Sequence, residues 1–258
     1  MRRQKKMEDY IKRMNEEYIK KNYPERSVFK AYKKSMGSRG RTGCIIMGLF
    51  MAGGLAGLIW SVRKTLEFMQ SGDDETMKVG IVIGIFFLIV TLFFGGILFL
   101  VTKDMRRSME EWISRIAAAG GCSEGEMREF DNQAVEPDSL IVNLLGKIKA
   151  VTAGQKSGIL TRDYIALYNS GSLGVLKVSR ITGAYLTDNV YNVKVGNSIK
   201  QAHYLTINLI TADKKNIWAE TSKEAGRALQ AILMERCPEI DTAGGAVLPE
   251  SEIAMMKR

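Results

Sequence analysis

His203 is the one histidine of the 258-residue chain, so any site that needs an imidazole would have to be built on it. A zinc site with histidine ligands or a Ser-His-Asp triad would therefore require His203 together with partners elsewhere in the sequence. The residue begins a run in which polar and apolar side chains alternate, which is typical of a strand. We interpret His203 as a structural histidine that is held by a hydrogen bond.

The three cysteines, Cys44, Cys122 and Cys237, lie far apart and form no CxxC pair. An odd number of widely spaced cysteines is typical of unpaired thiols in a reducing compartment. Cys237 is expected at the C-terminal end of a helix, where the helix dipole disfavours a thiolate. We therefore do not interpret it as an activated nucleophile.

Two common enzyme signatures are absent from the sequence, the GxxxxGK[ST] phosphate loop and the HExxH zinc motif. Asp163 follows Arg162, and we interpret this pair as a surface ion pair within a strand. These observations predict a protein that is not an enzyme and that needs no cofactor or catalytic metal.

Four basic residues could form a rim at one end of a β domain, where an acidic headgroup or peptide would bind: Lys177, Arg180, Lys194 and Lys200. The alternative is an ordinary solvated surface, because residues 130–258 carry fifteen Lys or Arg against thirteen Asp or Glu. This near-neutral balance also argues against nucleic acid as a partner, since a phosphate-binding surface needs a basic face. Tyr185 and Trp218 are expected in the core and not as ligand platforms.

Two long apolar runs, 43–62 and 79–101, dominate the N-terminal half. Each has about the 20 residues that a helix needs to cross a hydrocarbon core of about 30 Å. They predict a transmembrane hairpin, with residues 63–78 as a short extracytoplasmic loop. Neither run has an ionisable residue at mid-depth, which argues against a pump or a transporter acting alone.

Glycines recur at a spacing of four residues in both runs, at Gly53 and Gly57 and at Gly80 and Gly84. Small residues on one helix face allow two helix backbones to approach closely in a membrane. One interpretation is that the hairpin packs on itself, and the other is a homodimer.

The distribution of positive charge predicts the orientation of the hairpin. Residues 1–42 carry fourteen Lys or Arg against five Asp or Glu, whereas residues 63–78 carry three basic residues. Basic residues favour the cytoplasmic side of a membrane. We therefore expect a multi-pass protein of the cell membrane with both termini in the cytoplasm.

The segment 1–42 is interpreted as a basic cytosolic arm with an amphipathic helix, whose apolar stripe is Met7, Tyr10, Ile11, Met14, Tyr18 and Ile19. This helix could lie on the anionic lipids of the inner leaflet, or its stripe could pack on the soluble domain of the same chain. The glycines of residues 37–43 indicate a flexible approach to the membrane. After the second run, residues 102–139 predict a helical stalk that is broken at Gly120-Gly121. After this break, Ser123 and Glu126 have the spacing of a capping box.

Residues 140–238 predict an α+β domain, a small antiparallel β-barrel or sandwich that is closed by a C-terminal helix. The expected strands are 148–152, 159–168, 175–178, 181–187, 190–195, 203–211 and 216–220. Thr221 and Glu224 have the spacing of a capping box, and the helix that they begin is expected to end at Cys237. Residues 239–258 are interpreted as a mobile tail.

Leu160, Thr161, Ile165 and Tyr168, the turn at Gly174 and the run from Val178 to Tyr185 form a pattern that resembles the pleckstrin-homology-like (PH-like) domains of small bacterial membrane proteins. The later hairpin and the terminal helix, 203–236, lie where this resemblance requires them. The resemblance implies a PH-like fold and a membrane-proximal binding or assembly role. It implies neither a catalytic activity nor a particular lipid.

Together these observations predict a non-enzymatic, membrane-anchored scaffold that presents a PH-like domain at the inner membrane face to a protein partner or to a second copy. One alternative is an accessory subunit of a transport or envelope-assembly complex. Another is binding of acidic headgroups by the β domain.

Overall fold

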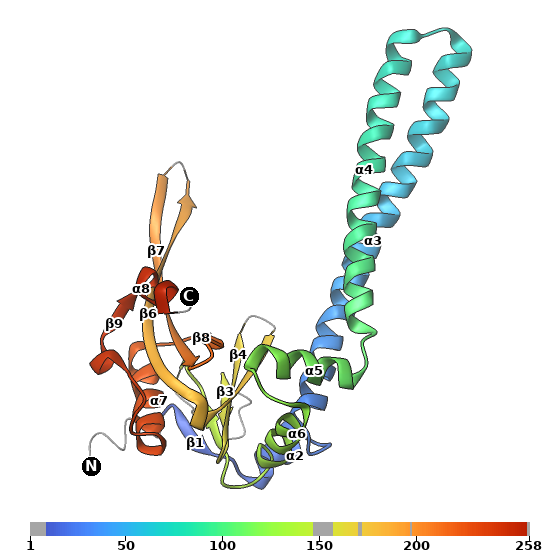
Figure 1. The fold of residues 1–258 in the computed structure, drawn as a ribbon. Helices are drawn as coiled ribbons and strands as arrows, with labels where there is room; N and C mark the ends of the chain where they lie inside the picture. The colour runs from blue at the N-terminus through green and yellow to red at the C-terminus, as the bar shows by residue number, and fades with distance from the viewer. Residues whose placement is uncertain (1–8, 147–156, 170–171, 197, 257–258) are drawn as a thin grey trace. The chain divides into compact units, whose positions relative to one another are not determined.

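The computed structural model describes residues 9–146, 157–169, 172–196 and 198–256. The chain divides into two compact units (Figure 1). One unit is Tyr32–Ser108, and the other joins the residues up to Ala31 with those from Met109 onward. We call them the helical unit and the α+β unit.

The helical unit consists of two long helices, α3 (Val28–Ser71, which begins in the α+β unit) and α4 (Asp74–Met105). Both are long and apolar enough to cross a membrane. At 1.5 Å per residue they extend for about 66 Å and about 48 Å, so each exceeds the apolar run that it contains. The connection is only Gly72, with φ +74°, and Asp73, so most of the expected loop 63–78 is helical.

The segment 37–43, expected to be flexible, lies inside α3. A glycine in a helix costs about 1 kcal/mol relative to alanine, but it does not stop a helix that continues on both sides. No proline lies between Val28 and Ser71, so nothing in the sequence breaks the helix there.

The α+β unit contains two sheets whose strands are almost all antiparallel. The first sheet has the order β1-β2-β3-β4-β5, and the second has the order β8-β7-β6-β9. Their strands are β1 Ile11–Arg13, β2 Leu140–Val142, β3 Gly158–Leu160, β4 Tyr164–Asn169, β5 Ser172–Lys177, β6 Ile181–Val195, β7 Ser198–Thr211, β8 Asn216–Glu220 and β9 Val247–Pro249. Among the described strands, β6 and β9 are the one pair that runs parallel. Over the described residues neither sheet closes into a barrel, and the two sheets share one core.

That core lies between the two sheets and the helix α7 (Lys223–Arg236). Leu160, Ile165 and Leu176 come from the first sheet, and Leu186 and Ile207 come from the second. The helix adds residues at helical spacing on one face: Ala225, Leu229, Ile232 and Leu233. The expected α+β class, with antiparallel sheets followed by a C-terminal helix, is confirmed.

Several strand boundaries differ from the expected ones. The run 148–152 lies outside the described residues. The run 159–168 is divided into β3 and β4 by a turn at Arg162 and Asp163, so this ion pair lies in a turn and not in a strand. Residues 181–187 and 190–195 form one continuous strand, β6, because its hydrogen-bonded register with β7 continues through Asp188 and Asn189.

The N-terminal segment forms β1 and a short helix, α2 (Glu16–Asn22), so a single helix along the stripe is wrong for the described residues 9–22. Asn15 caps α2, and β1 pairs with β2. The stripe residues Ile11, Met14, Tyr18 and Ile19 are buried. The stripe therefore packs on the α+β unit of the same chain, which was the second of the two interpretations.

The expected stalk is also wrong, because its helices α5 (Met109–Gly120) and α6 (Glu124–Gln133) belong to the α+β unit. Ile116, Met127 and Phe130 are buried, and the backbone of Gly120 lies directly against the carbonyl of Val175. The capping box of Ser123 and Glu126 is confirmed at the start of α6. For α7, the capping residue is Ser222 and not Thr221.

The expected mobile tail carries regular structure through residue 256. It contains a 3₁₀ turn (Ala243–Gly245), β9 and the helix α8 (Glu250–Met256). Ile253 is buried and forms a small cluster with Tyr185 and Ile210, on the face of the second sheet opposite the main core. The contact of Ile253 with Tyr185 and Ile210 therefore holds the C-terminal segment on the sheet, although its composition indicated a mobile tail.

Candidate functional site

The four basic residues of the expected rim do not form one rim. Lys177 ends β5 and Arg180 ends a 3₁₀ turn (Val178–Arg180), whereas Lys194 and Lys200 lie near the tip of the β6–β7 hairpin. Lys194 lies thirteen positions after Ile181 along β6, which corresponds to a strand path of about 43 Å. The sequence could not give this separation, because it indicated two short strands in place of one long one.

Lys177 and Arg180 meet at Glu126 of α6. The Arg180 Nη2 atom lies 2.8 Å from Glu126 Oε1, and the Lys177 Nζ atom lies 3.4 Å from it. The Arg180 guanidinium also donates a 2.5 Å hydrogen bond to the carbonyl of Gly121. The backbone N–H of Ser123, and then the two cations, hold the pKa of Glu126 below its usual value. Both basic groups therefore hold α6 on the sheet.

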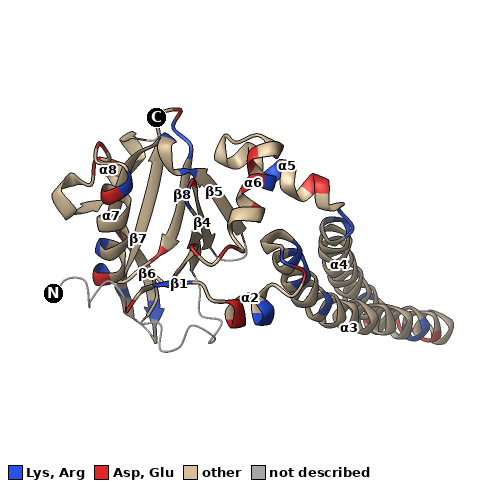
Figure 2. Ribbon diagram, turned by 90° about the horizontal axis from the view of Figure 1, so that it is seen from below, with Lys and Arg blue, Asp and Glu red and all other residues tan. Residues whose placement is uncertain are grey.

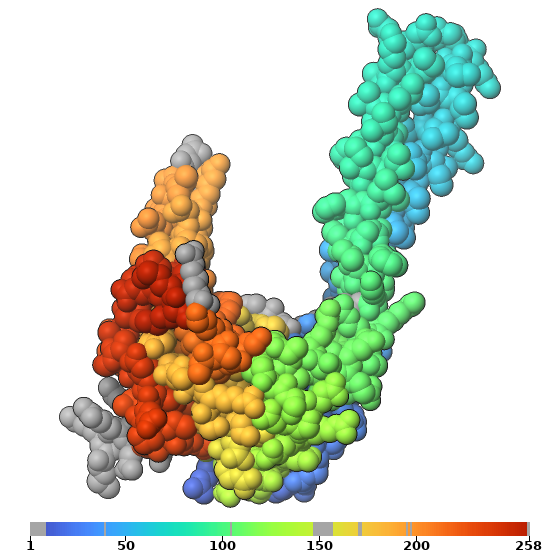
Figure 3. Space-filling model, viewed as in Figure 1, coloured from blue at the N-terminus to red at the C-terminus, as the bar shows by residue number. Residues whose placement is uncertain are grey.

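Lys194 and Lys200 lie on a part of the hairpin that projects beyond the rest of the α+β unit (Figure 3). Elsewhere on this unit, basic and acidic residues lie close together, as on α5 and α7 (Figure 2). The solvated-surface interpretation fits these helices, and the projecting hairpin is the exception.

His203 lies on the same hairpin, and its Nδ1 atom is 3.0 Å from Asp188 Oδ2. The side chains are 56% and 37% exposed, so this is a surface contact. The expected hydrogen bond of His203 is confirmed. Among the described residues, no group of three or more His, Cys, Asp or Glu side chains could hold a metal ion.

The three cysteines are free thiols. Burial, and then the carboxylate of Glu126, raise the pKa of Cys122, so this thiol is protonated at neutral pH. Cys237 follows the last turn of α7, as expected, and its Sγ atom lies 3.7 Å from the carbonyl oxygen of Val178. Burial therefore opposes a thiolate at Cys122.

The two aromatic residues expected in the core differ in their placement. Tyr185 is buried, and its hydroxyl donates a 2.8 Å hydrogen bond to Asp241. Burial, and then Asp241, raise the pKa of Tyr185 to about 12. Trp218 is 36% exposed, because Ile217 and Ala219 face the core and alternation along β8 turns Trp218 outward. The core assignment of Trp218 is therefore wrong.

Three of the four selected glycines lie in the contact between α3 and α4. A Cβ atom at Gly57 would come within 2.5 Å of the Phe87 ring, and one at Gly80 would come within 2.5 Å of Thr65 Oγ1. At Gly84 the nearest atom would be Ser61 Oγ, at 3.2 Å. At Gly53 no atom lies within 4 Å, so this glycine is not part of the contact.

Sequence reasoning missed Gly54, where a Cβ atom would come within 2.6 Å of Thr91 Oγ1. The glycine pair at positions 53 and 54 offers two helix faces, and spacing alone does not distinguish them. The four-residue spacing to Gly57 pointed to Gly53, whereas Gly54 and Gly57, three residues apart, also share a face.

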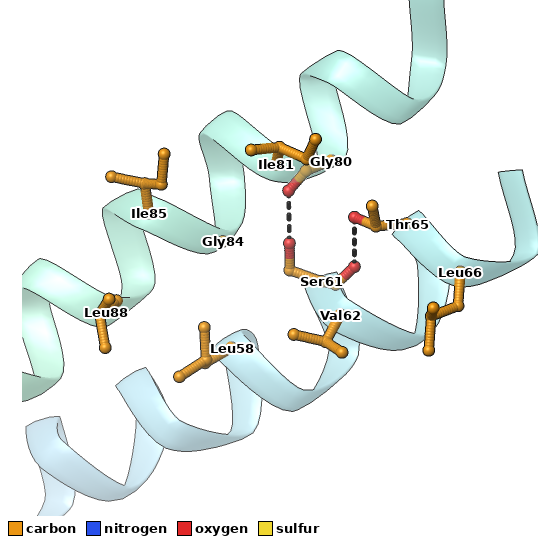
Figure 4. A pocket seen from close by; sticks show the side chains of 10 residues that line it. All are labelled: Leu58, Ser61, Val62, Thr65, Leu66, Gly80, Ile81, Gly84, Ile85 and Leu88. Atoms are coloured by element: carbon orange, nitrogen blue, oxygen red, sulfur yellow. Dashed lines mark hydrogen bonds between the residues drawn. The ribbon is translucent and has the colours of Figure 1, made fainter. Parts of the chain in front are cut away.

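A shallow groove of about 280 Å³ lies along this contact (Figure 4). It is lined by Leu58, Ser61, Val62, Thr65, Leu66, Gly80, Ile81, Gly84, Ile85 and Leu88. The hydroxyl of Ser61 donates to the carbonyl of Gly80 at 2.7 Å, and that of Thr65 donates to the carbonyl of Ser61 at 2.8 Å. Both hydroxyls already donate to backbone carbonyls. A molecule in this groove would therefore make mainly apolar contacts and would meet no reactive side chain.

Comparisons of the chain with protein-family models, with curated proteins and with solved structures gave no match. Function is therefore inferred from the residues and their geometry. In the part of the chain that the structure describes, large apolar side chains are exposed along the outer faces of α3 and α4 and on the projecting end of the β6–β7 hairpin.

Proposed function

We propose that the chain is a non-enzymatic membrane anchor that presents its α+β unit at the inner face of the cell membrane to a protein partner. The observation that carries this proposal is the exposure of large apolar side chains along both long helices. They include Ile45, Leu49, Phe50, Ile59, Trp60, Val82, Phe86, Ile89, Leu92, Phe93, Phe99 and Leu100. In water such a surface would far exceed the apolar patches of ordinary soluble proteins, whereas lipid tails solvate it without cost.

The polar side chains of the two helices support a lipid environment. The hydroxyls of Ser61, Thr65, Thr91 and Thr102 all donate to backbone carbonyls, at distances of 2.7 to 2.8 Å. A hydroxyl in the hydrocarbon core needs such a partner, because no water is present there. This pattern is typical of helices that span a membrane.

Charge supports the orientation. The three basic residues between 63 and 78 are few beside the fourteen before residue 43, and Lys103, Arg106 and Arg107 follow the second apolar run. By this distribution, the short connection at Gly72 and Asp73 lies outside the cell and both termini lie in the cytoplasm.

The order of elements in the α+β unit supports the PH-like part of the proposal. An antiparallel meander from β2 to β5 is followed by a second meander from β6 to β8 and then by α7. Two meanders and a helix that covers the shared core are what the resemblance implies. The fold does not point to any particular reaction. We base the interaction role on the membrane anchor and on the surfaces described above, which present no reactive side chains.

Extraction and labelling test this proposal. The chain should stay in the membrane fraction after alkaline carbonate treatment. In a background without native cysteines, Ser71→Cys should react with a membrane-impermeant maleimide in intact cells, and Lys214→Cys should react only after permeabilisation. Release by carbonate contradicts the anchor, and the reverse labelling pattern contradicts the orientation. For the partner, proteins that co-purify with the full chain should be lost when residues 109–258 are deleted.

A further inference from the structure

The projecting end of the β6–β7 hairpin, residues 189–196 and 198–204, is a two-stranded ribbon; we call it the hairpin extension. On β6 the pairing with β9 ends at Asp188, and on β7 the pairing with β8 ends at Thr206. Beyond these points the two strands pair with each other, from Asn189↔Tyr204 to Val195↔Ser198. Figure 1 shows the ribbon leaving the sheet. An isolated two-stranded ribbon is marginally stable in water, which suggests that something contacts it.

Apolar side chains are unusually exposed on this ribbon. Ile199 is 74% exposed, Tyr191 50% and Val190 46%. Tyr191 and Tyr204 pack edge to face with ring centroids 5.5 Å apart, which holds both rings on one face of the ribbon. These side chains are not part of the main core, to which β6 and β7 contribute residues such as Leu186 and Ile207.

The charge of the hairpin extension has one sign. It contains Lys194 and Lys200, and residues 189–204 include no Asp or Glu. Near the tip, Lys194 lies opposite Ile199, and Val193 lies opposite Lys200. Since residues that lie opposite each other point to the same side, each face of the tip presents one lysine beside one aliphatic side chain.

This combination selects the kind of partner. A second copy that paired ribbon to ribbon would bring like charges together, which opposes association. Two lysines are few for a nucleic acid, which is held by many phosphate contacts. A bilayer with anionic headgroups offers negative charge above an apolar layer, and tyrosine is enriched at that boundary.

We propose that the hairpin extension docks tip first on an anionic lipid surface, so that both faces of the ribbon contact it. Lys194 and Ile199 lie on one face, and Lys200 and the two tyrosines lie on the other. The two lysines then reach headgroup phosphates, and Ile199 and the tyrosines lie in the interfacial layer. This inference rests on the proposed function, because the membrane anchor tethers the α+β unit to a bilayer. It adds a second, reversible membrane contact whose strength depends on lipid charge.

Hydrogen exchange of the full chain tests this proposal. The chain is placed in nanodiscs of phosphatidylcholine alone or of phosphatidylcholine mixed with phosphatidylglycerol, and exchange is read in peptides that cover residues 189–204. We expect slower exchange in the anionic discs. The double variant Lys194→Gln and Lys200→Gln should weaken docking about 30-fold, since each lysine near an anionic surface contributes about a fivefold factor. Ile199→Ser should also reduce the protection.

The matched control is Lys214→Gln with Lys215→Gln, at the turn between β7 and β8 of the same sheet. It removes the same charge from a turn that also holds Asp213, and it should leave the exchange of residues 189–204 unchanged. Protection of the buried strand residues 207–210 reports that each variant is folded.

The proposal would be overturned by equal exchange in both kinds of disc or by protection that survives the lysine variants. Protection that grows with protein concentration would indicate a second copy and would overturn it too. Protection that needs an added acidic protein and not the anionic lipid would also overturn it. A failure of the membrane anchor is seen separately, as release by carbonate. In that case the dependence on lipid charge is measured by adding anionic or neutral vesicles to the released chain.

Discussion

The hydroxyl of Ser61 donates a 2.7 Å hydrogen bond to the backbone carbonyl of Gly80, which joins α3 to α4 within an apolar contact. This bond requires the two backbones to lie close together. Gly80 permits the approach, because a Cβ atom there would come within 2.5 Å of Thr65 Oγ1. In a membrane, such a bond between helices contributes about 0.6 to 2 kcal/mol. The small residues of the hairpin therefore serve contact within one chain.

Leucine substitutions distinguish the glycines that lie in this contact from the one that does not. Gly57→Leu and Gly80→Leu should each lower the thermal midpoint of the hairpin, because overpacking costs about 1 to 3 kcal/mol. Gly53→Leu should leave it unchanged, since no atom lies within 4 Å of a Cβ atom there. The midpoint is measured by gel filtration of the detergent-solubilised chain after heating. An equal loss for Gly53→Leu would mean that this glycine faces a partner molecule.

The first residues of α3 are capped by a side chain far away in the sequence. Asp131 Oδ1 of α6 accepts hydrogen bonds from the backbone N–H of Val28 at 2.6 Å and from that of Phe29 at 3.2 Å. Asp131→Ala should destabilise the α+β unit by about 1 to 2 kcal/mol, as the loss of a helix cap does. Asp131→Asn should lose less, because it keeps an acceptor oxygen.

The control for this cap is Asp138→Ala, since the Asp138 side chain is 95% exposed. Denaturant unfolding of the full chain in mild detergent, followed by tryptophan fluorescence, gives the two midpoints. Equal midpoints for Asp131→Ala and Asp138→Ala would show that the cap contributes nothing measurable.

What the sequence could predict was local. The two apolar runs, the capping box of α6, the strand β8 and the amphipathic helix α7 were predicted because their signals lie within a few neighbouring residues. The burial of the N-terminal stripe depended on pairing between Ile11 and Val142, and the cap of α3 depended on Asp131. Such contacts over more than 100 residues leave no mark in a single sequence.

The candidate sites show the same division. Spacing correctly indicated that Gly57, Gly80 and Gly84 share a packing role, but it selected Gly53 over Gly54. The four basic residues do not form one site. The sequence shows neither that Arg180 pairs with Glu126 nor that β6 is one long strand. Asp188-Asn189 is typical of a turn, but Asn189 is held inside the sheet by a 2.9 Å hydrogen bond from its Nδ2 to Thr206 Oγ1.

The stabilisation by Glu126 should depend on pH with a defined sign. Its pKa in the folded state lies below the ordinary value of 4.5. Glu126 therefore contributes stability that is fully present above pH 4.5 and that is lost as the pH falls through the lowered pKa. At neutral pH, Glu126→Gln should cost about 1 kcal/mol, because its partners Arg180 and Lys177 are partly exposed.

The measurement compares the unfolding midpoints of the wild type and Glu126→Gln from pH 3 to pH 7. The difference should be constant above about pH 5 and should shrink below it. Glu124→Gln, an exposed position in the same first turn of α6, is the matched control for the loss of one negative charge at this end of the helix. A difference for Glu126→Gln that stays constant down to pH 3 would exclude the ionic contribution.

Two glycines at neighbouring helices should respond to alanine with opposite signs. At Gly120, which ends α5, a Cβ atom would collide with the carbonyl oxygen of Val175 in β5, and backbone on both sides cannot move away. Gly120→Ala should therefore destabilise the α+β unit by about 3 kcal/mol. At Gly125 the nearest atom is Ser123 Oγ at 3.8 Å, so Gly125→Ala should stabilise α6 by up to about 1 kcal/mol. Denaturant midpoints of the two variants in the full chain measure both effects. If Gly120→Ala matches the wild type, α5 does not lie on β5 in solution, and the helical stalk regains its place as the interpretation of residues 102–139.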